Sequence, residues 1–316
     1  MIRTVIASTI VAGLVLNTVL LALSQSPIDS QDQRPRYQVS VDMVSLSLTA
    51  FDKEHRLVTD LEQEEFKIYE DGVLQDVNIF SKEDLPLRLV ILLDTSSSMR
   101  IKMEMAKEAA IEFVRSLKPE DQFKVIEFDD RVLTLIDFTA DLEQVEGAIA
   151  GAVADGATAL YNAVYISLQS LSRRRKVDER QAVVVLSDGN DTGSLVTFED
   201  VLELARKTDV TIYTILLRGT EKDLKKTKYF QAKYVLERLA VESGGSAFSP
   251  EHIKDLSEVY GEIASELKSQ YNLGYISTNT QADGKWRRIQ LVCTRLGMDL
   301  RTRSGYYAPR PRRRRR

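Results

Sequence analysis

The stretch Leu87–Met99, which reads LRLVILLDTSSSM, decides the predicted fold of this chain. Leu89–Leu93 is an unbroken apolar run, as expected of a strand that is buried on both faces of a parallel sheet. The run ends in the polar segment Asp94–Ser98, and a helical pattern begins at about Met103. The polar segment is therefore predicted to lie at the carboxyl edge of the sheet, where ligands of open α/β sheets bind.

Three side chains of this polar segment could share one ligand. Asp94, Ser96 and Ser98 are spaced two residues apart, so in a turning loop they can converge on one point. One carboxylate and two hydroxyls form an all-oxygen set, which suits a hard divalent cation such as Mg²⁺. The same residue types also cap helices and form turns, so the loop alone is equally consistent with a helix cap. Two later segments favour the metal site.

Strands and helices alternate from Leu87 to about Lys268, which predicts an α/β fold with a doubly wound, mostly parallel sheet and helices on both faces. After Leu89–Leu93, the predicted strands are Gln122–Phe128, Val132–Phe138, Ala182–Leu186, Val210–Leu217 and Ser246–Phe248. The first two of these are expected to form an antiparallel hairpin at a sheet edge. The predicted helices after the first are Leu142–Ala152, Leu160–Leu171, Phe198–Lys207, Tyr229–Val241 and Ile253–Lys268.

Both flanks of this α/β region show the period-two alternation that is typical of strands. On the amino-terminal side, the alternation in Tyr37–Ala50 slips by one residue, which suggests a β-bulge, and Asp71-Gly72 predicts a hairpin before Val73–Phe80. On the other side the predicted strands are Tyr271–Tyr275, Trp286–Thr294 and Leu300–Tyr307. We expect the flanks to pair into one smaller all-β domain, with the α/β domain inserted between them. The alternative is two β appendages that dock separately.

These patterns divide the chain of 316 residues into six parts. They are a signal peptide (1–26), a linker (27–36), a first β region (37–85), the α/β domain (86–268), a second β region (269–309) and a basic tail (310–316). A hydrophobic fraction of 43% and a charged fraction of 28% are ordinary for a globular protein, and the net charge of −4 gives no general argument for nucleic-acid binding. The arginine-rich tail is interpreted as a solvated chain end.

The amino-terminal segment Met1–Ser26 has the features of a secretory signal. Arg3 supplies a positive charge, Val5–Leu23 is mostly apolar, and small residues at Ala22–Ser24 fit a cleavage site. The polar interruptions favour a cleaved signal peptide, with an uncleaved membrane anchor as the alternative. We therefore expect a secreted, periplasmic or cell-envelope protein. Cys293, the single cysteine, is predicted to be a small core residue.

Two further polar segments carry the site chemistry. Asp155–Leu160 (DGATAL) offers the hydroxyl of Thr158 beside a helix start, and Leu186–Asp191 (LSDGND) places Asp188 at the end of the second buried strand. If the two buried strands are neighbours, both acidic residues approach one ion at the same edge, and octahedral positions remain for water and a ligand. The five candidate ligands are Asp94, Ser96, Ser98, Thr158 and Asp188.

This series of motifs resembles a known site. Asp94-x-Ser96-x-Ser98, then Thr158 in GATALYNA, then Asp188 in LSDGND is similar to the metal-ion-dependent adhesion site of von Willebrand factor type A domains. The resemblance covers roughly residues 87–265, and the flanking segments VTDLEQEEFKIYEDGVLQDV and RTRSGYYAP resemble those of secreted bacterial von Willebrand factor A-related proteins. One departure is Ser97, where the family often has glycine. A side chain there would strain the loop if the position needs a positive φ.

The resemblance implies that Asp94, Ser96 and Ser98 bind the cation directly, and that Thr158 and Asp188 contact it directly or through water. The implied ion is Mg²⁺, with Mn²⁺ or Ca²⁺ as alternatives. Because few of these ligands are anionic, the ion stays electrophilic, and an acidic side chain of a protein partner can complete its shell. Asp155 and Asp191 are interpreted as turn formers instead.

The sequence gives little support for an enzyme. The chain has only two histidines, His55 and His252, both predicted to lie on the surface, and it lacks a G-x-S-x-G elbow, an H-E-x-x-H motif and a Walker loop. We expect a non-enzymatic, exported, adhesion-type protein-binding module. The alternatives are a structural or assembly factor of the cell envelope whose metal only stabilises it and, less favoured, a metal-dependent hydrolase.

Overall fold

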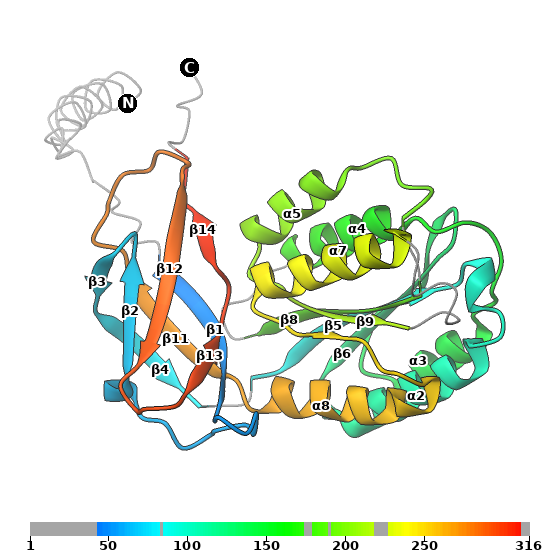
Figure 1. Ribbon diagram of the computed structural model, residues 1–316, viewed down its shortest axis with the longest axis horizontal. Coiled ribbons are helices and arrows are strands. Elements are labelled where there is room, and N and C mark those ends of the chain that lie inside the picture. The colour runs from blue at the N-terminus through cyan, green and yellow to red at the C-terminus, as the bar shows by residue number, and fades with distance from the viewer. Residues whose placement is uncertain (1–42, 83–84, 174–178, 189–190, 218–226, 311–316) are drawn as a thin grey trace, which may run out of the picture. The chain divides into compact units, whose positions relative to one another are not determined.

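The computed structural model describes residues 43–82, 85–173, 179–188, 191–217 and 227–310. These residues form an α/β part with a six-stranded sheet and a β part with two four-stranded sheets (Figure 1). The predicted signal peptide, the linker, the alternation in 37–41 and the arginine run 312–316 lie outside the described residues. Within the described ranges, no helix combines the length and the apolar composition that crossing a bilayer requires.

The α/β part is organised around a sheet with the strand order β10-β9-β8-β5-β6-β7. Its strands are β5 (Leu87–Asp94), β6 (Gln122–Phe128), β7 (Val132–Thr139), β8 (Arg180–Ser187), β9 (Thr211–Leu216) and β10 (Ala247–Phe248). β5 lies between β8 and β6 and pairs in parallel with both, whereas β7 pairs antiparallel with β6 at the edge. The predicted mostly parallel sheet with an edge hairpin is confirmed.

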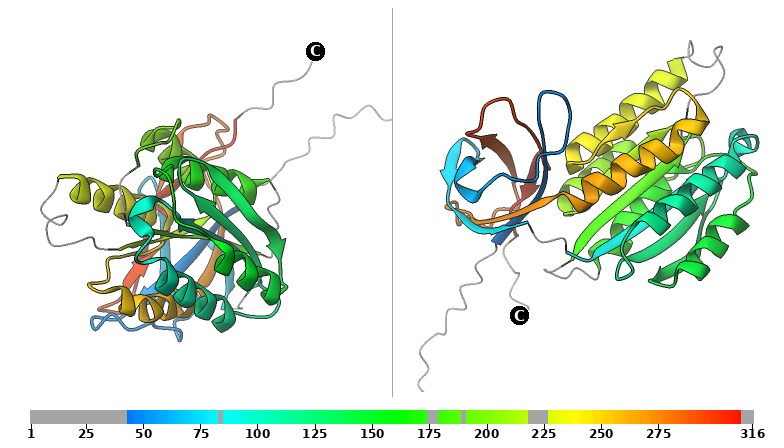
Figure 2. Two further views of the ribbon diagram at one scale, coloured as in Figure 1. Left: turned by 90° about the vertical axis from the view of Figure 1, so that its right-hand side faces the viewer. Right: turned by 90° about the horizontal axis from the view of Figure 1, so that it is seen from below.

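Helices cover both faces of this sheet (Figure 1, Figure 2). They are α2 (Met103–Ser116), α3 (Leu142–Gly151), α4 (Leu160–Ser172), α5 (Phe198–Lys207), α7 (Thr227–Ser243) and α8 (Leu256–Lys268), with short 3₁₀ turns η2 (Ser97–Met99) and η3 (Ile253–Asp255). α2, α3 and α8 pack against Leu89 and Ile91 of β5, and α4, α5 and α7 pack against Val90 and Leu92 on the other face. Neighbouring strand residues point to opposite faces, both of which are covered. The central residues Leu89–Leu93 of β5 are therefore all apolar.

The β part combines the two flanks of the chain. Its sheets have the orders β13-β1-β11-β4 and β14-β12-β2-β3. Its elements are β1 (Met43–Phe51), η1 (Gln63–Glu65), β2 (Phe66–Glu70), β3 (Val73–Gln75), β4 (Val77–Ser81), β11 (Tyr271–Ile276), β12 (Trp286–Cys293), β13 (Asp299–Arg301) and β14 (Gly305–Tyr307). β1 pairs with β11 and β2 with β12, so the amino-terminal and carboxyl-terminal flanks form one set of sheets as predicted. The boundaries at residues 86 and 268 stay a prediction.

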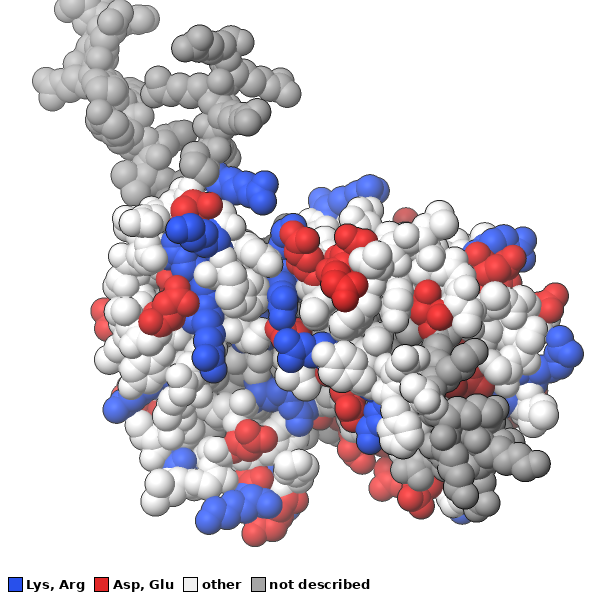
Figure 3. Space-filling view, turned by 45° about the horizontal axis from the view of Figure 1, so that its top comes forward, with Lys and Arg blue, Asp and Glu red and all other residues white. Residues whose placement is uncertain are grey.

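The two sheets share one apolar core. It includes Leu46, Ile68, Leu273 and Ile289, which come from four strands in both sheets. Cys293 is partly buried and packs against this core, in agreement with its predicted role. On the face drawn in Figure 3, acidic and basic side chains are interspersed over both parts of the molecule, so this face presents no broad surface of one charge.

The predicted hairpin at Asp71-Gly72 is present, but the strand after it is divided. Asp71 and Gly72 have φ values of 47° and 84°, the two positive values that a tight turn of type I′ requires. The predicted strand Val73–Phe80 separates into β3 and β4, which belong to different sheets. The side chain of Gln75 is buried at this change of sheet and donates to Thr278 Oγ1 at 3.0 Å. Alternation continues through the change, so the sequence pattern does not reveal it.

The predicted strand Leu300–Tyr307 is divided in the same way, into β13 and β14. The residues between these strands contact the α/β part: the Arg303 guanidinium pairs with Asp209, and Ser304 Oγ donates to Glu242 Oε2 at 2.5 Å. Asp209 lies two residues before β9 and Glu242 lies at the end of α7, so these contacts are at the amino edge of the sheet. The carboxyl edge, where the candidate ligands lie, is the opposite one.

Candidate metal centre

The polar loop after β5 is held against its neighbours by backbone hydrogen bonds. Thr95 N–H donates to the carbonyl of Phe128 at the end of β6, at 2.9 Å. The Thr95 carbonyl accepts from Asp155 N–H at 2.6 Å, and Ser97 N–H donates to the carbonyl of Gly156 at 3.1 Å. These bonds place the first predicted motif directly beside the second.

Asp94 is the most deeply buried of the candidate ligands. Its side chain is 0% exposed; Oδ1 accepts from Ser96 N–H at 2.9 Å and Oδ2 accepts from Ser187 Oγ at 2.5 Å. Burial raises the pKa of Asp94 to about 6, and the nearby charge of Asp188 also raises it, against the lowering effect of the hydrogen bonds from the two serines. Among the described residues, no Lys, Arg or His forms an ion pair with Asp94.

Ser98 connects the loop after β5 to the loop after β8. Its Oγ lies 3.1 Å from Ser96 Oγ and donates to Asp188 Oδ1 at 2.7 Å. Because β5 and β8 are neighbouring parallel strands, the loops that follow them meet at one edge, as the sequence predicts. Ser98 is exposed, so solvent reaches this group of oxygen atoms.

These oxygen spacings fit a small octahedral cation. Mg²⁺ binds oxygen at about 2.0–2.1 Å with octahedral geometry, which places adjacent ligand oxygens about 3 Å apart. The separations of 3.1 Å from Ser96 Oγ to Ser98 Oγ and of 2.7 Å from Ser98 Oγ to Asp188 Oδ1 are close to this spacing. The described residues contain no group of three or more His, Cys, Asp or Glu side chains that could hold a metal, so a cation at this edge would depend on hydroxyl ligands.

Backbone hydrogen bonds position Thr158 at the same edge of the sheet. Its N–H donates to Thr192 Oγ1 at 3.1 Å, and its carbonyl accepts from the N–H groups of Thr192 and Gly193 at 2.8 and 3.0 Å. The residue is 6% exposed. Within the described part of the chain, its hydroxyl forms no hydrogen bond with the other four candidate ligands. Hydrogen bonds therefore link four of the five candidates, namely Asp94, Ser96, Ser98 and Asp188, and Thr158 lies beside them.

Two other acidic residues near the motifs have local roles. Asp191 Oδ1 accepts from Tyr161 N–H at 3.1 Å and from Ser194 Oγ at 2.5 Å, so it satisfies the amino terminus of α4. Asp155 is exposed, and its carboxylate lies 3.9 Å from the Arg100 guanidinium. Ser97 is not among the described residues with a positive φ, so the departure from glycine at this position causes no backbone strain.

Sequence reasoning misses two residues at this edge. Ser187, the last residue of β8, donates to Asp94, and its place next to Asp188 in LSDGND was the available signal. Lys102 Nζ lies 2.5 Å from Asp188 Oδ2, and the Lys102 side chain is 20% exposed. No motif or spacing marks Lys102, because this ion pair joins residues 86 positions apart.

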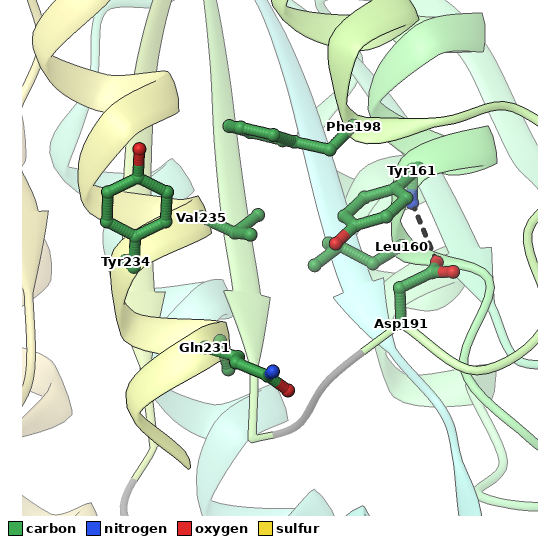
Figure 4. A pocket seen from close by; sticks show the side chains of 8 residues that line it. Leu160, Tyr161, Asp191, Phe198, Gln231, Tyr234 and Val235 are labelled. Atoms are coloured by element: carbon green, nitrogen blue, oxygen red, sulfur yellow. Dashed lines mark hydrogen bonds between the residues drawn. The ribbon is translucent and has the colours of Figure 1, made fainter. Parts of the chain in front are cut away.

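An aromatic pocket of about 350 Å³ lies between α4, α5 and α7 (Figure 4). The amino-terminal turns of α4 and α5 and one side of α7 line it, with Tyr161, Phe198 and Tyr234 as the aromatic side chains and Asp191 at the wall. The lining begins at Leu160, two residues after Thr158, and Asp191 follows Asp188 by three residues. The pocket lining is thus close in sequence to two of the candidate ligands.

Two features of the α/β part can be compared with known families. They are the mostly parallel sheet with helices on both faces, and the motif D-x-S-x-S at the carboxyl edge of that sheet. Residues 89–190 match the family model described as von Willebrand factor type A domain. The solved structure of a von Willebrand factor type A protein from Catenulispora acidiphila has a TM-score of 0.50 and 14% identity, and the match covers 87% of this chain and 76% of that chain. Residues 89–190 of this chain therefore carry a von Willebrand factor type A domain, and the fold of the α/β part agrees with this assignment.

Similar curated proteins are much longer than this chain. Inter alpha-trypsin inhibitor heavy chain 4 from Mus musculus is 25% identical over 220 residues, and inter-alpha-trypsin inhibitor heavy chain H4 from Homo sapiens is 26% identical over 221 residues. Each match covers 64% of this chain but only 22% and 23% of the relatives, so the chain spans less than a quarter of their length.

Proposed function

We propose that this chain is an exported, metal-dependent protein-binding module. It binds a divalent cation, with Mg²⁺ as the first candidate and Mn²⁺ or Ca²⁺ as alternatives, and an acidic side chain of a protein partner completes the shell of that ion. The ligands are those identified from the sequence, Asp94, Ser96, Ser98, Thr158 and Asp188. The observation that supports this most directly is the position of Ser98 Oγ, between Ser96 Oγ and Asp188 Oδ1 at spacings that suit an octahedral shell.

The balance of charge among these ligands favours binding of a further anion. Two of the five are carboxylates and three are neutral hydroxyls, so the protein does not give the ion an excess of negative charge. Hard cations of this kind prefer oxygen ligands, and a carboxylate from outside would be the strongest one available. Because Ser98 is exposed while Asp94 is fully buried, the open side of the shell would face solvent.

The surroundings of the site suit a protein partner. Ile101, beside the metal loop, is 96% exposed, and Leu195, in the loop after Asp191, is 94% exposed. Both side chains belong to loops that carry candidate metal ligands, so a partner bound to the metal would cover them. We expect the acidic partner to cover both residues and to extend over the aromatic pocket, so that apolar burial adds to the charge interaction at the metal.

Export rests on the composition of Met1–Ser26, which precedes the described residues. The module acts outside the cytoplasm, in the envelope or the surrounding medium. The proposal assigns no catalytic step: the bound ion holds a partner carboxylate and the complex dissociates unchanged. The competing hypothesis is that the chain is an envelope assembly factor whose metal only stabilises it. The two hypotheses differ in whether partner binding requires the metal.

The test uses the full chain and three variants. Calorimetric titration with Mg²⁺ should show one binding site in the unaltered protein and in Asp155→Ala, and none in Asp94→Ala or Asp188→Ala, with unchanged circular dichroism in all four. Partners would then be captured from an extract of the source envelope, in Mg²⁺ or in EDTA. Capture that needs both Mg²⁺ and Asp94 supports the proposal. Metal binding without metal-dependent capture supports the stabilising role, and absence of Mg²⁺ binding in the unaltered protein contradicts both.

A further inference from the structure

The candidate metal centre already contains a cation of the protein itself. Lys102 Nζ lies 2.5 Å from Asp188 Oδ2, and the two side chains are 20% and 5% exposed. Lys102 is the residue that precedes α2, and its carbonyl accepts from Ala106 N–H at 3.0 Å, so its backbone belongs to the first turn of the helix. The backbone is thus fixed, while the four-carbon side chain turns back to the site.

This ammonium group balances charge where two carboxylates lie close together. The charge of Asp188 acts on Asp94, which is completely buried. In the described part of the chain, the pair with Lys102 is the one ion pair formed by either carboxylate. Buried or half-buried charges need a partner or a metal, and Lys102 supplies part of what a divalent cation would supply.

The same contact opposes metal binding. Both oxygens of Asp188 are engaged, Oδ2 by the Lys102 ammonium and Oδ1 by the Ser98 hydroxyl. A divalent ion at Ser98 and Asp188 would lie within a few ångströms of the ammonium, and like charges at that distance repel strongly at a protein surface. Lysine is suited to leaving such a place, because its charge is compact and its stem is flexible.

We propose that Lys102 is the built-in counter-cation of this site, which occupies Asp188 in the metal-free protein and is displaced when the divalent ion binds. This inference rests on the proposed function, because it concerns the affinity of the same metal site. Lys102 lowers the intrinsic affinity for Mg²⁺, so tight metal binding requires the additional negative charge of the partner carboxylate. Metal and partner therefore each strengthen the binding of the other.

The opposite role of Lys102 would make an equally specific prediction. If Lys102 instead orients Asp188 for the metal and stays in contact with it, removal of the ammonium weakens Mg²⁺ binding. The two roles thus predict changes of opposite sign for the same substitution.

The experiment is a titration of the full-length protein with Mg²⁺ alone, comparing the unaltered chain with Lys102→Met and Lys102→Gln. Methionine keeps the length of the side chain and removes its charge. We expect both variants to bind Mg²⁺ about tenfold more tightly or better, a change that corresponds to about 1.4 kcal/mol. The control is Lys107→Met on α2, whose ammonium pairs with Glu104 at 3.3 Å and should leave the affinity unchanged.

A second readout does not need metal. In EDTA, Lys102→Met should unfold at a lower temperature than the unaltered protein, because Asp188 has lost its counter-charge, and saturating Mg²⁺ should remove this difference. Equal or weaker Mg²⁺ binding by both variants overturns the counter-cation role of Lys102 and leaves the proposed function intact. Mg²⁺ binding by neither the unaltered chain nor the variants overturns the proposed function, and the counter-cation with it. Binding by the variants alone supports the counter-cation and contradicts metal use by the unaltered chain.

Discussion

Both parts of the molecule bury carboxylate groups, and one from each part shows how differently their charge is compensated. Glu70 in the β part is 2% exposed and pairs with the equally buried Arg287, whose Nη1 lies 3.2 Å from Glu70 Oε1. Three hydroxyl groups donate to the same carboxylate, those of Tyr275, Ser277 and Tyr306. Asp94 in the α/β part is 0% exposed and receives a hydroxyl and a backbone N–H but no cation from the described residues.

The difference fits a structural role for Glu70 and the proposed metal-binding role for Asp94. The Glu70 network is complete within the protein, and it ties β2 of the amino-terminal flank to three strands of the carboxyl-terminal flank. The surroundings of Asp94 are incomplete, and burial raises its pKa to about 6. A buried charge without a partner lowers stability unless a cation arrives from outside. A site that is incomplete in this way is suited to binding a metal.

The largest effect should come from breaking the complete network. Arg287→Met leaves Glu70 buried without its counter-charge, and removing one member of a buried ion pair costs about 3–5 kcal/mol. Urea unfolding should show this loss of free energy of unfolding. The matched control is Arg288→Met, the exposed neighbour on β12, for which we expect less than about 0.5 kcal/mol. Equal losses for the two variants would show that the Glu70 network does not hold the flanks together.

The incomplete site should make the metal-free protein less stable as pH rises. The pKa of Asp94 is about 6 when folded against 3.8 for the free side chain, so between these values the native state holds more protons than the unfolded state. The free energy of unfolding therefore decreases by on the order of 2–3 kcal/mol as pH rises from about 4 to about 6. Above about pH 6, ionisation of Asp94 causes no further decrease.

The measurement is a series of denaturant unfolding curves in EDTA across this pH range. Asp94→Asn cannot ionise, so its curve should lack this decrease. A decrease of the same size in the variant would assign it to other groups, for example Glu266, whose pKa burial also raises.

Addition of metal should complete the incomplete site. At a Mg²⁺ concentration about 100 times the dissociation constant, binding to the native state adds about 2.7 kcal/mol of stability. Calorimetric melting at pH 7.5 should show this gain in the unaltered protein and none in Asp94→Asn. Glu70→Gln makes the same chemical change in the complete network and should keep the full response to Mg²⁺. Loss of the response in both variants would mean that it reports general stability rather than the metal site.

The smallest effect should come from Asp191, which lies beside the site but serves the helix. Asp191→Ala removes the acceptor for Tyr161 N–H at the amino terminus of α4, and loss of such a cap costs about 1 kcal/mol. Thermal melting should detect this loss, whereas the Mg²⁺ affinity should stay within about twofold of the unaltered protein. A loss of Mg²⁺ binding comparable to that of Asp188→Ala would make Asp191 a ligand.

Features that depend on local sequence were predicted well. The strand β5 was identified from the unbroken apolar run Leu89–Leu93, which is typical of a strand covered on both faces. The hairpin at Asp71-Gly72 was identified because few residue pairs adopt two positive φ values. The meeting of Asp94 and Asp188 followed from two parallel strands that end in polar loops, provided that the strands are neighbours, as β5 and β8 are.

Features that depend on contacts between distant residues were not predicted. Val73–Phe80 and Leu300–Tyr307 were expected to be single strands, because alternation continues when a chain moves from one sheet to another. Lys102 and Arg287 were not identified, since a single basic residue carries no sign of which carboxylate it will meet.

Sequence patterns were enough to establish the α/β fold, its β flanks and the residue types from which a metal site could be built, because burial and backbone conformation constrain each segment locally. The folded structure was needed to show that Glu70 is fully paired while Asp94 is not, and that Lys102 lies against Asp188. Charge compensation depends on distances between side chains from separate segments. Those distances are set when the strands and helices pack together.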